Sequence, residues 1–145
     1  MSRLRETIDF GHGSFFRIER WSGDDRCVQI IQGRSDVQRV PAFGARWHYH
    51  SAIELTSVLR GTSTCFVADR LQRFDTGELF VLGENIPHYW HHPRGSEGIS
   101  ILWEFPTAHP FANINELKSL RLLADQALRG LGVGGSSGRL ACRRI

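Results

Sequence analysis

The sequence is poor in cysteine, with three in 145 residues. Their number is odd and none form a Cys-x-x-Cys pair, so neither a disulfide framework nor a thiolate zinc site is indicated. Unpaired cysteines are typical of a reducing compartment. No apolar run approaches the roughly 18 residues that a membrane span requires, and the start, MSRLRETIDF, lacks the apolar stretch of a signal peptide. These absences predict a soluble cytoplasmic protein that does not contact a membrane.

A net positive charge is also missing from most of the chain, although the pI is about 9.1. All 15 acidic residues lie at or before Asp125, and four of the 18 basic residues follow it, so residues 1–125 carry a net charge of −1. A DNA-binding surface neutralises phosphates with Lys and Arg. We therefore do not expect this part of the chain to bind DNA specifically.

Short segments rich in β-branched and aromatic residues recur between glycine-containing turns. Strands are expected at residues 14–21, 27–32, 53–59, 63–68, 71–74, 78–82, 87–90 and 98–105. Strands at roughly 8–12-residue spacing are typical of an all-β sandwich or barrel. The pattern predicts one β domain over residues 14–112.

The two ends of the chain have different patterns. Residues 1–13 are polar and are predicted to be a flexible arm. From residue 113 the apolar residues recur on one face of a helix, which predicts an amphipathic helix over 113–131. Its leucine face either covers the β domain or pairs with a second chain. Residues 132–145 are rich in glycine and serine and then basic, which predicts a linker or a disordered basic tail.

Four side chains with metal-ligand chemistry lie between residues 47 and 90. His48 and His50 are two positions apart, Glu54 follows, and His88 lies near a later strand. Because side chains alternate along a strand, the first three are expected on one face of one strand. Imidazole and carboxylate groups are ligands for Fe, Mn, Ni, Zn or Cu. The four residues therefore predict either a site for one divalent transition metal or a polar pocket for a small molecule.

Two neighbours extend this candidate pocket. By the same alternation, Arg46 shares a face with His48, and Trp90 shares a face with His88. An arginine and an aromatic ring beside imidazoles form a lining suited to a small polar ligand such as a sugar. Core packing is the alternative role of Trp90, and no residue is assigned a catalytic role. The expected ligand-binding residues are Arg46, His48, His50, Glu54, His88 and Trp90.

These residues resemble the two motifs of the cupin superfamily. The first motif, His-x-His-x3-Glu-x6-Gly, is matched in full, and the second is matched by its first glycine and its histidine. The matching residues are His48, His50, Glu54, Gly61, Gly77 and His88, and the departures are Ala42, Gly83, Asn85 and His92. The departures leave the metal-ligand set intact and change the turn between the motifs. The resemblance implies a cupin double-stranded β-helix, a jelly-roll barrel, followed by the amphipathic helix.

Residues 14–131 also resemble the N-terminal effector-sensing domain of AraC-type transcriptional regulators, in the segments HYHSAIEL and TGELFVLGENIPHYW and in the helix. This resemblance implies binding of a small effector, often a sugar, and a homodimer formed through helix 113–131. It assigns DNA binding to a C-terminal helix-turn-helix domain that these 145 residues lack. The expected function is therefore that of a sensor domain truncated before its DNA-binding domain. A small metal-dependent cupin enzyme, of dioxygenase or isomerase type, is the alternative, and a binding protein without a partner domain is a third.

Overall fold

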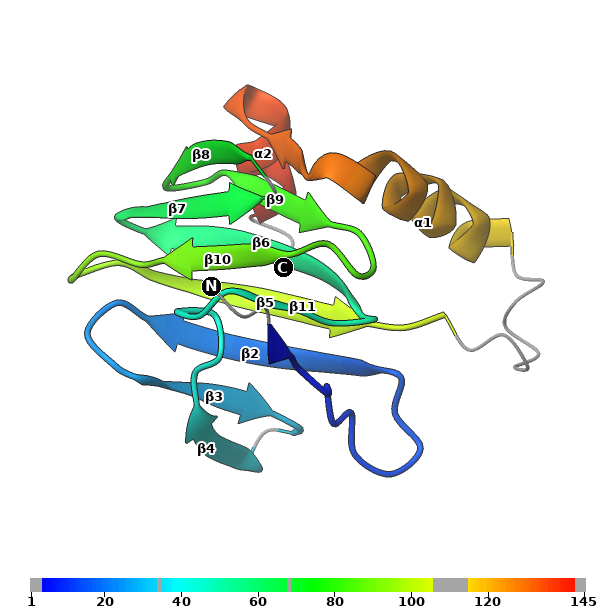
Figure 1. Cartoon of the computed structure of the whole chain (residues 1–145), viewed down its shortest axis with the longest axis horizontal. Coiled ribbons are helices and arrows are strands. Elements are labelled where there is room, and N and C mark those ends of the chain that lie inside the picture. Colours follow the sequence, from blue (N-terminus) through cyan, green and yellow to red (C-terminus); the bar gives the residue numbers. More distant parts are fainter. Residues whose placement is uncertain (1–3, 34, 68, 106–114, 143–145) are drawn as a thin grey trace.

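The computed structural model describes residues 4–33, 35–67, 69–105 and 115–142, and its strands form two sheets (Figure 1). The five-stranded sheet has the order β1–β5–β10–β7–β8, with strands at Leu4–Arg5, His48–Tyr49, His88–His91, Thr62–Val67 and Arg70–Asp75. The seven-stranded sheet has the order β12–β9–β6–β11–β2–β3–β4, with strands at Leu131–Val133, Leu79–Leu82, Ile53–Arg60, Glu97–Trp103, Phe16–Ser22, Cys27–Ile31 and Val37–Pro41.

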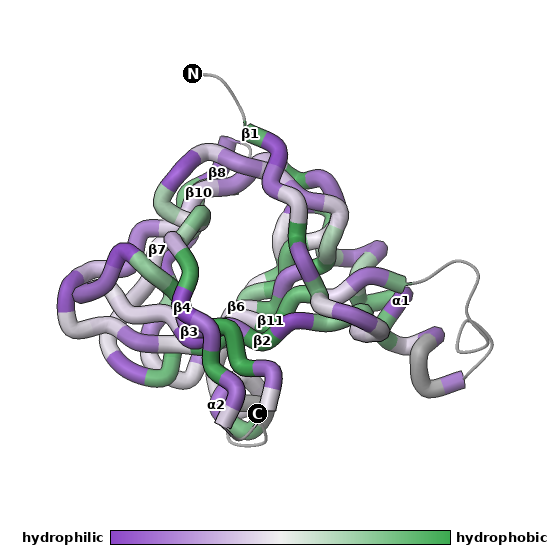
Figure 2. The backbone as a smooth tube through the Cα atoms, turned by 90° about the horizontal axis from the view of Figure 1, so that it is seen from below, coloured by the Kyte–Doolittle hydropathy of each residue, from purple (hydrophilic) through white to green (hydrophobic). Residues whose placement is uncertain are grey.

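The two sheets form the opposite walls of the domain. Figure 2 shows β1, β10 and β7 on one side and β6, β11 and β2 on the other, with the helix α1 outside. Apolar side chains from both sheets fill one end of the space between them, among them Trp21, Val58, Phe74, Phe80 and Trp90. The predicted all-β jelly roll with a C-terminal helix is confirmed by this arrangement.

Strand β6 is covered on both of its faces. Glu54 and Thr56 are buried on its inner face, whereas Ile53 and Leu55 belong to an apolar cluster with residues of the C-terminal helical segment. That segment consists of α1 at Asn115–Gln126 and a 3-10 turn at Ala127–Arg129. Gly130 ends the helical segment with a φ of 76°, a conformation that favours glycine.

The helix differs from its prediction in extent and in orientation. Residues 113–114, where it was expected to begin, lie outside the described residues. Ala124 and Ala127 face the sheet, while Leu120 and Leu128 of the predicted apolar face are 39% and 60% exposed. Ala124 and Ala127 pack against Val81 and Ile53. Because alanine side chains are small, they allow the helical segment to lie close to the sheet. No described helix is long and apolar enough to cross a membrane.

The described residues near both ends of the chain have more secondary structure than their composition predicts. Within the arm 1–13, β1 pairs in parallel with β5, and Ile8 packs on Ala52 and Leu102. Within the tail 132–145, β12 pairs with β9, and a second helix, α2, spans Gly135–Cys142. Backbone hydrogen bonds to a distant strand hold β1 and β12, and such pairings leave no periodic signal in short, polar or glycine-rich segments.

Candidate metal centre

Three buried histidines converge between the two sheets. His48 on β5 lies opposite His88 on β10 in the antiparallel register, and His50 follows in the bend after β5. Each has at most 2% of its surface exposed. One ring nitrogen of each lies within 4.8 Å of those of the other two. The strand pairing and the bend therefore bring together three imidazoles from two separate segments of the chain.

The outer nitrogen of each ring is held by a backbone carbonyl. Nδ1 of His48 donates to the carbonyl oxygen of Arg46 at 2.7 Å, and Nδ1 of His50 donates to that of Ala52 at 2.8 Å. Nδ1 of His88 donates to the carbonyl oxygen of Ile86 at 2.8 Å. A carbonyl only accepts, so each Nδ1 carries the proton and each Nε2 of a neutral ring presents a lone pair. Such anchoring of the second nitrogen is characteristic of metal-binding histidines.

Glu54 supplies a carboxylate to the same point from β6. Its Oε2 lies 3.3 Å from Nε2 of His50 and 3.3 Å from Nε2 of His88. Its other oxygen, Oε1, accepts hydrogen bonds from the hydroxyls of Thr56 at 2.6 Å and Ser100 at 3.5 Å. These hydroxyls orient the carboxylate and leave Oε2 directed at the imidazoles.

Potential ligand atoms are concentrated at this point. Nε2 of His88 is buried without a hydrogen-bond partner among the described residues. Burial opposes a charge on His50, yet its hydrogen bond with Glu54 raises the pKa of that imidazole above its ordinary value. Burial likewise opposes ionisation of Glu54, but the neighbouring imidazoles of His50 and His88 hold its pKa well below the usual range. Lone pairs and a carboxylate oxygen at this separation require a cation between them, either a proton or a metal ion.

The donor set fits a divalent transition metal. Nitrogen and carboxylate ligands lie roughly 2.0–2.2 Å from such an ion, so two ligands on one ion are separated by about 3.0–3.6 Å. The 3.3 Å separations between Glu54 and two histidines match this range. His48, His50, His88 and Glu54 would hold the metal, and the predicted convergence of these four residues is observed.

The reason for the convergence differs from the prediction. His48 and Glu54 were expected on one face of a single strand, but β5 and β6 belong to different sheets. The chain crosses from one sheet to the other through residues 50–52, and His50 lies in this crossing. The backbone bend, rather than strand alternation, directs the three groups to one point.

A second layer of charge lies beside the histidines. Arg17 on β2 forms ion pairs with Glu19 and, at 3.7 Å, with Glu6. Glu6 also lies 3.4 Å from Nε2 of His48. Burial raises the pKa of Glu6 to about 7 and also raises the pKa of Glu19. Burial together with the neighbouring His88 lowers the pKa of His48 to about 4, so this imidazole is neutral at pH 7.

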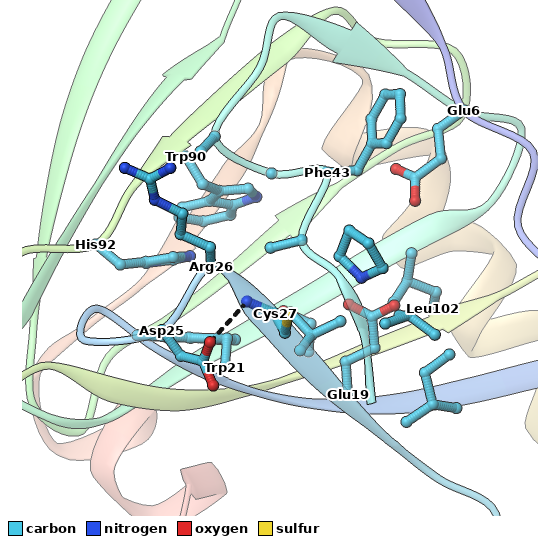
Figure 3. A pocket seen from close by; sticks show the side chains of 18 of the residues that line it. Glu6, Glu19, Trp21, Asp25, Arg26, Cys27, Phe43, Trp90, His92 and Leu102 are labelled. Carbon is cyan, nitrogen blue, oxygen red and sulfur yellow. Dashed lines mark hydrogen bonds between the residues drawn. The ribbon is translucent and has the colours of Figure 1, made fainter. Parts of the chain in front are cut away.

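His48, His50 and Glu54 line a cavity of about 720 Å³ that extends between the sheets. Figure 3 shows Glu6 and Glu19 pointing into it from opposite sides, with Trp90 and His92 together at its other end. There His92 stacks on Trp21, with ring centroids 3.8 Å apart. The indole N–H groups of Trp21 and Trp90 have no acceptor among the residues described. The cavity thus has a polar end at the histidines and an aromatic end with free donors.

The remaining predicted ligand-binding residues, Arg46 and Trp90, both line this cavity. Arg46 is exposed at its edge, where its guanidinium lies 5.7 Å from the centre of the Phe43 ring. Trp90 is 3% exposed and packs against Phe74 and Phe80, so it also has the core role that was its alternative.

Several residues of the cavity were not predicted from the sequence. Arg17, Glu19 and Trp21 alternate along the strand FRIERWS and all face the interior, a pattern that was visible in the sequence. Trp21 lies flat across β11 at Gly98, where a Cβ atom would come within 2.0 Å of the indole. Only the structure places Glu6 at the histidines, because its position depends on the pairing of β1 with β5.

No protein-family model matches the chain, and no curated protein does either. Among solved structures, an oxalate decarboxylase matches with 15% identity and a TM-score of 0.42, over 79% of this chain and 39% of that one. A single-residue mutant of the Bacillus subtilis oxalate decarboxylase matches with 14% identity and a TM-score of 0.42, over 72% of this chain and 36% of that one. The chain spans about a third of the length of these structures. Because these similarities are low, the fold assignment rests on the strand order of this chain, and the description of the site rests on its own geometry.

Proposed function

We propose that this chain is a cupin-type domain that binds a small molecule at a divalent metal held by His48, His50, His88 and Glu54. The observation that carries the proposal is the convergence of three buried imidazole nitrogens and a carboxylate oxygen at one point beside a cavity. Fe, Mn, Ni, Zn and Cu all accept this nitrogen and oxygen donor set.

The ligand that fits this cavity is small, polar and rich in oxygen. A volume of about 720 Å³ lies in the roughly 300–1,000 Å³ range of small-molecule sites. When bound, the metal polarises a ligand oxygen as a Lewis acid. The free N–H groups of Trp21 and Trp90 donate to further oxygens, and their rings provide apolar surface for a ring face. A sugar meets these requirements.

We assign the domain the role of an effector sensor of the AraC type. The support is the sequence resemblance over residues 14–131 and the exposure of Leu120, Leu122 and Leu128 on the helical segment after the sheets. These leucines are the surface through which a homodimer would form. DNA binding belongs to a helix-turn-helix domain outside these 145 residues. Light scattering of the protein and of a Leu122→Glu variant tests the dimer. We expect the unsubstituted protein to be dimeric and the variant to be monomeric.

A metal-dependent cupin enzyme is the second candidate. It is favoured by the position of His48, His50 and Glu54 in the wall of the cavity, from which a substrate could reach the metal. The two roles differ in what happens to the bound molecule. A sensor returns it unchanged, whereas an enzyme converts it.

Metal analysis of the purified protein tests the shared part of both proposals. The protein is loaded separately with Mn²⁺, Fe²⁺, Ni²⁺, Cu²⁺ or Zn²⁺, desalted and measured by inductively coupled plasma mass spectrometry. A His48→Ala, His50→Ala double variant is the control. We expect about one metal ion per chain and none in the variant. Equal, near-zero metal in both proteins would overturn the metal centre.

A ligand screen separates the sensor from the enzyme. Sugars and small hydroxy acids are tested by thermal shift on the metal-loaded protein, and each stabilising compound is incubated and analysed by mass spectrometry. Recovery of the unchanged compound supports the sensor. Conversion that requires the metal supports the enzyme and contradicts the sensor role.

A further inference from the structure

We propose that Glu6 is a fifth protein ligand of the metal centre, so that the metal fastens the N-terminal strand β1 to the site. This inference rests on the metal centre proposed above and adds a ligand from a segment outside the four-residue set. Glu6 precedes His48 by more than forty positions and belongs to neither of its motifs.

The distances divide the imidazoles between two carboxylates. Oε2 of Glu54 lies 3.3 Å from Nε2 of His50 and from Nε2 of His88. His48 instead has Oε2 of Glu6, at 3.4 Å. Each of these separations is one that two ligands on a single ion have, roughly 3.0–3.6 Å. With Glu6 included, every imidazole of the cluster has a carboxylate oxygen at ligand-sharing distance.

The charges around the site point to the same conclusion. Glu6, Glu19 and Glu54 bring three carboxylates to one cavity, and Arg17 is the cation paired with two of them. Acidic side chains thus outnumber basic ones around the histidines, an excess that a bound cation would reduce. Nε2 of His88, fully buried and without a hydrogen-bond partner in the described chain, is directed at the same point.

The local structure is built to present Glu6. Its backbone N–H donates to the carbonyl oxygen of Tyr49 at 2.9 Å, and that of Leu4 donates to Trp47 at 3.1 Å. Two residues later, Ile8 is buried against Ala52 and Leu102. The hydrogen bond to Tyr49 and the packing of Ile8 fix the chain on both sides of the Glu6 side chain. Two backbone hydrogen bonds and one buried side chain hold β1 only weakly to β5. Coordination by Glu6 would therefore contribute much of the stability of this pairing.

Glu19 provides a matched control in the same cavity. It lines the cavity and is partly buried, but its ion pair is with Arg17, and none of the ion pairs described joins it to a histidine. A Glu19→Gln substitution removes the same charge from the same cavity without removing a proposed ligand. A general electrostatic effect would affect both positions, whereas a coordinating role affects Glu6 alone.

Titration with Co²⁺ under anaerobic conditions tests the inference, with the visible absorption band reporting the ligand set and calorimetry reporting the affinity. Glu6→Gln is expected to weaken binding by about 10–100-fold and to change the band shape. Glu19→Gln is expected to weaken it by less than about 3-fold with the same band. Circular dichroism of the metal-free proteins checks that each variant is folded, and Glu6→Asp provides a second, shorter carboxylate.

Hydrogen exchange adds a readout that does not depend on affinity. Amides of residues 4–9 are expected to exchange more slowly with Zn²⁺ bound in the unsubstituted protein, and at an unchanged rate in Glu6→Gln. If the unsubstituted protein binds no metal, the metal centre itself is wrong. If it binds metal and Glu6→Gln has the same affinity, band and exchange, only the assignment of Glu6 is overturned.

Discussion

His88 is the first residue of β10, and His92 directly follows its last residue. The two imidazoles have contrasting surroundings. His88 is 1% exposed, its Nδ1 donates to a backbone carbonyl, and its Nε2 lies among acceptors. Nδ1 of His92 lies 2.8 Å from the hydroxyl of Ser63, and the imidazole stacks between Trp21 and Trp90. Both rings are packed inside the domain, but only His88 directs a ring nitrogen at other potential ligands.

The difference shows that the partner of the second ring nitrogen determines the role. A carbonyl fixes the proton of His88 on Nδ1 and leaves the other nitrogen free to coordinate. The indoles of Trp21 and Trp90 instead stack on the two faces of the His92 ring. Burial lowers the pKa of His92 to about 4, so at pH 7 it is a neutral aromatic ring. Residue type and spacing on β10 do not distinguish these two environments. The contrast yields four predictions.

The largest effect is expected from His88→Ala, which removes one of three convergent ring nitrogens. We expect metal affinity to fall by more than about 100-fold, measured by calorimetry with Zn²⁺. His92→Phe should leave the affinity unchanged. A comparable loss in both variants would mean that the two histidines are not functionally distinct.

Trp21→Ala is expected to break the aromatic end of the cavity. The indole is 4% exposed and belongs to the cluster between the sheets, so its truncation should lower the free energy of unfolding by about 3–5 kcal/mol. Urea denaturation measures the loss. The remaining folded protein should still bind about one metal ion per chain, since no proposed ligand is removed, and a metal-free folded variant would contradict the separation of the two ends.

The pH dependence of stability sharpens the same contrast. The pKa of His92 is lowered from 6.5 to about 4 by burial, so the folded protein binds fewer protons than the unfolded chain. Its stabilising contribution is complete above pH 6.5 and is lost as the pH falls toward 4. The difference corresponds to about 3 kcal/mol. Urea unfolding of the protein and of His92→Phe from pH 7 to 4 should show a shallower decline in the variant, and identical declines would exclude His92 as a cause.

The smallest effect is expected from His91→Ala. This side chain is exposed on the other face of β10, so the free energy of unfolding should change by less than about 0.5 kcal/mol. Metal affinity should be unchanged, which makes the variant a control for the loss of a histidine from this strand. A large effect on either quantity would place a function on the outer face of the sheet.

The residues of the proposed metal centre were predictable because the motif places their residue types at recognisable spacings. The strands that carry His88 and Glu54 were predictable from β-branched and aromatic segments between glycine turns. The crossing between sheets at residues 50–52 was not, since the alternation of a continuous strand predicts the same residues on one side. Glu6 was not predictable, because its place depends on two backbone hydrogen bonds to a segment more than forty residues away. His92 stacks between indoles that only the folded chain brings together.

Strand β6 has a consequence for anyone who redesigns this pocket. Its successive residues Ile53 and Glu54 contact the helical segment on one side and the histidines on the other. Deleting or inserting one residue within the strand would exchange the two faces, placing Leu55 at the histidines and a carboxylate beneath α1. The strand can therefore accept substitutions one position at a time but no change of length. Insertions and deletions are better placed in the turns that join the strands, because a change in the number of turn residues does not exchange the two faces of a strand.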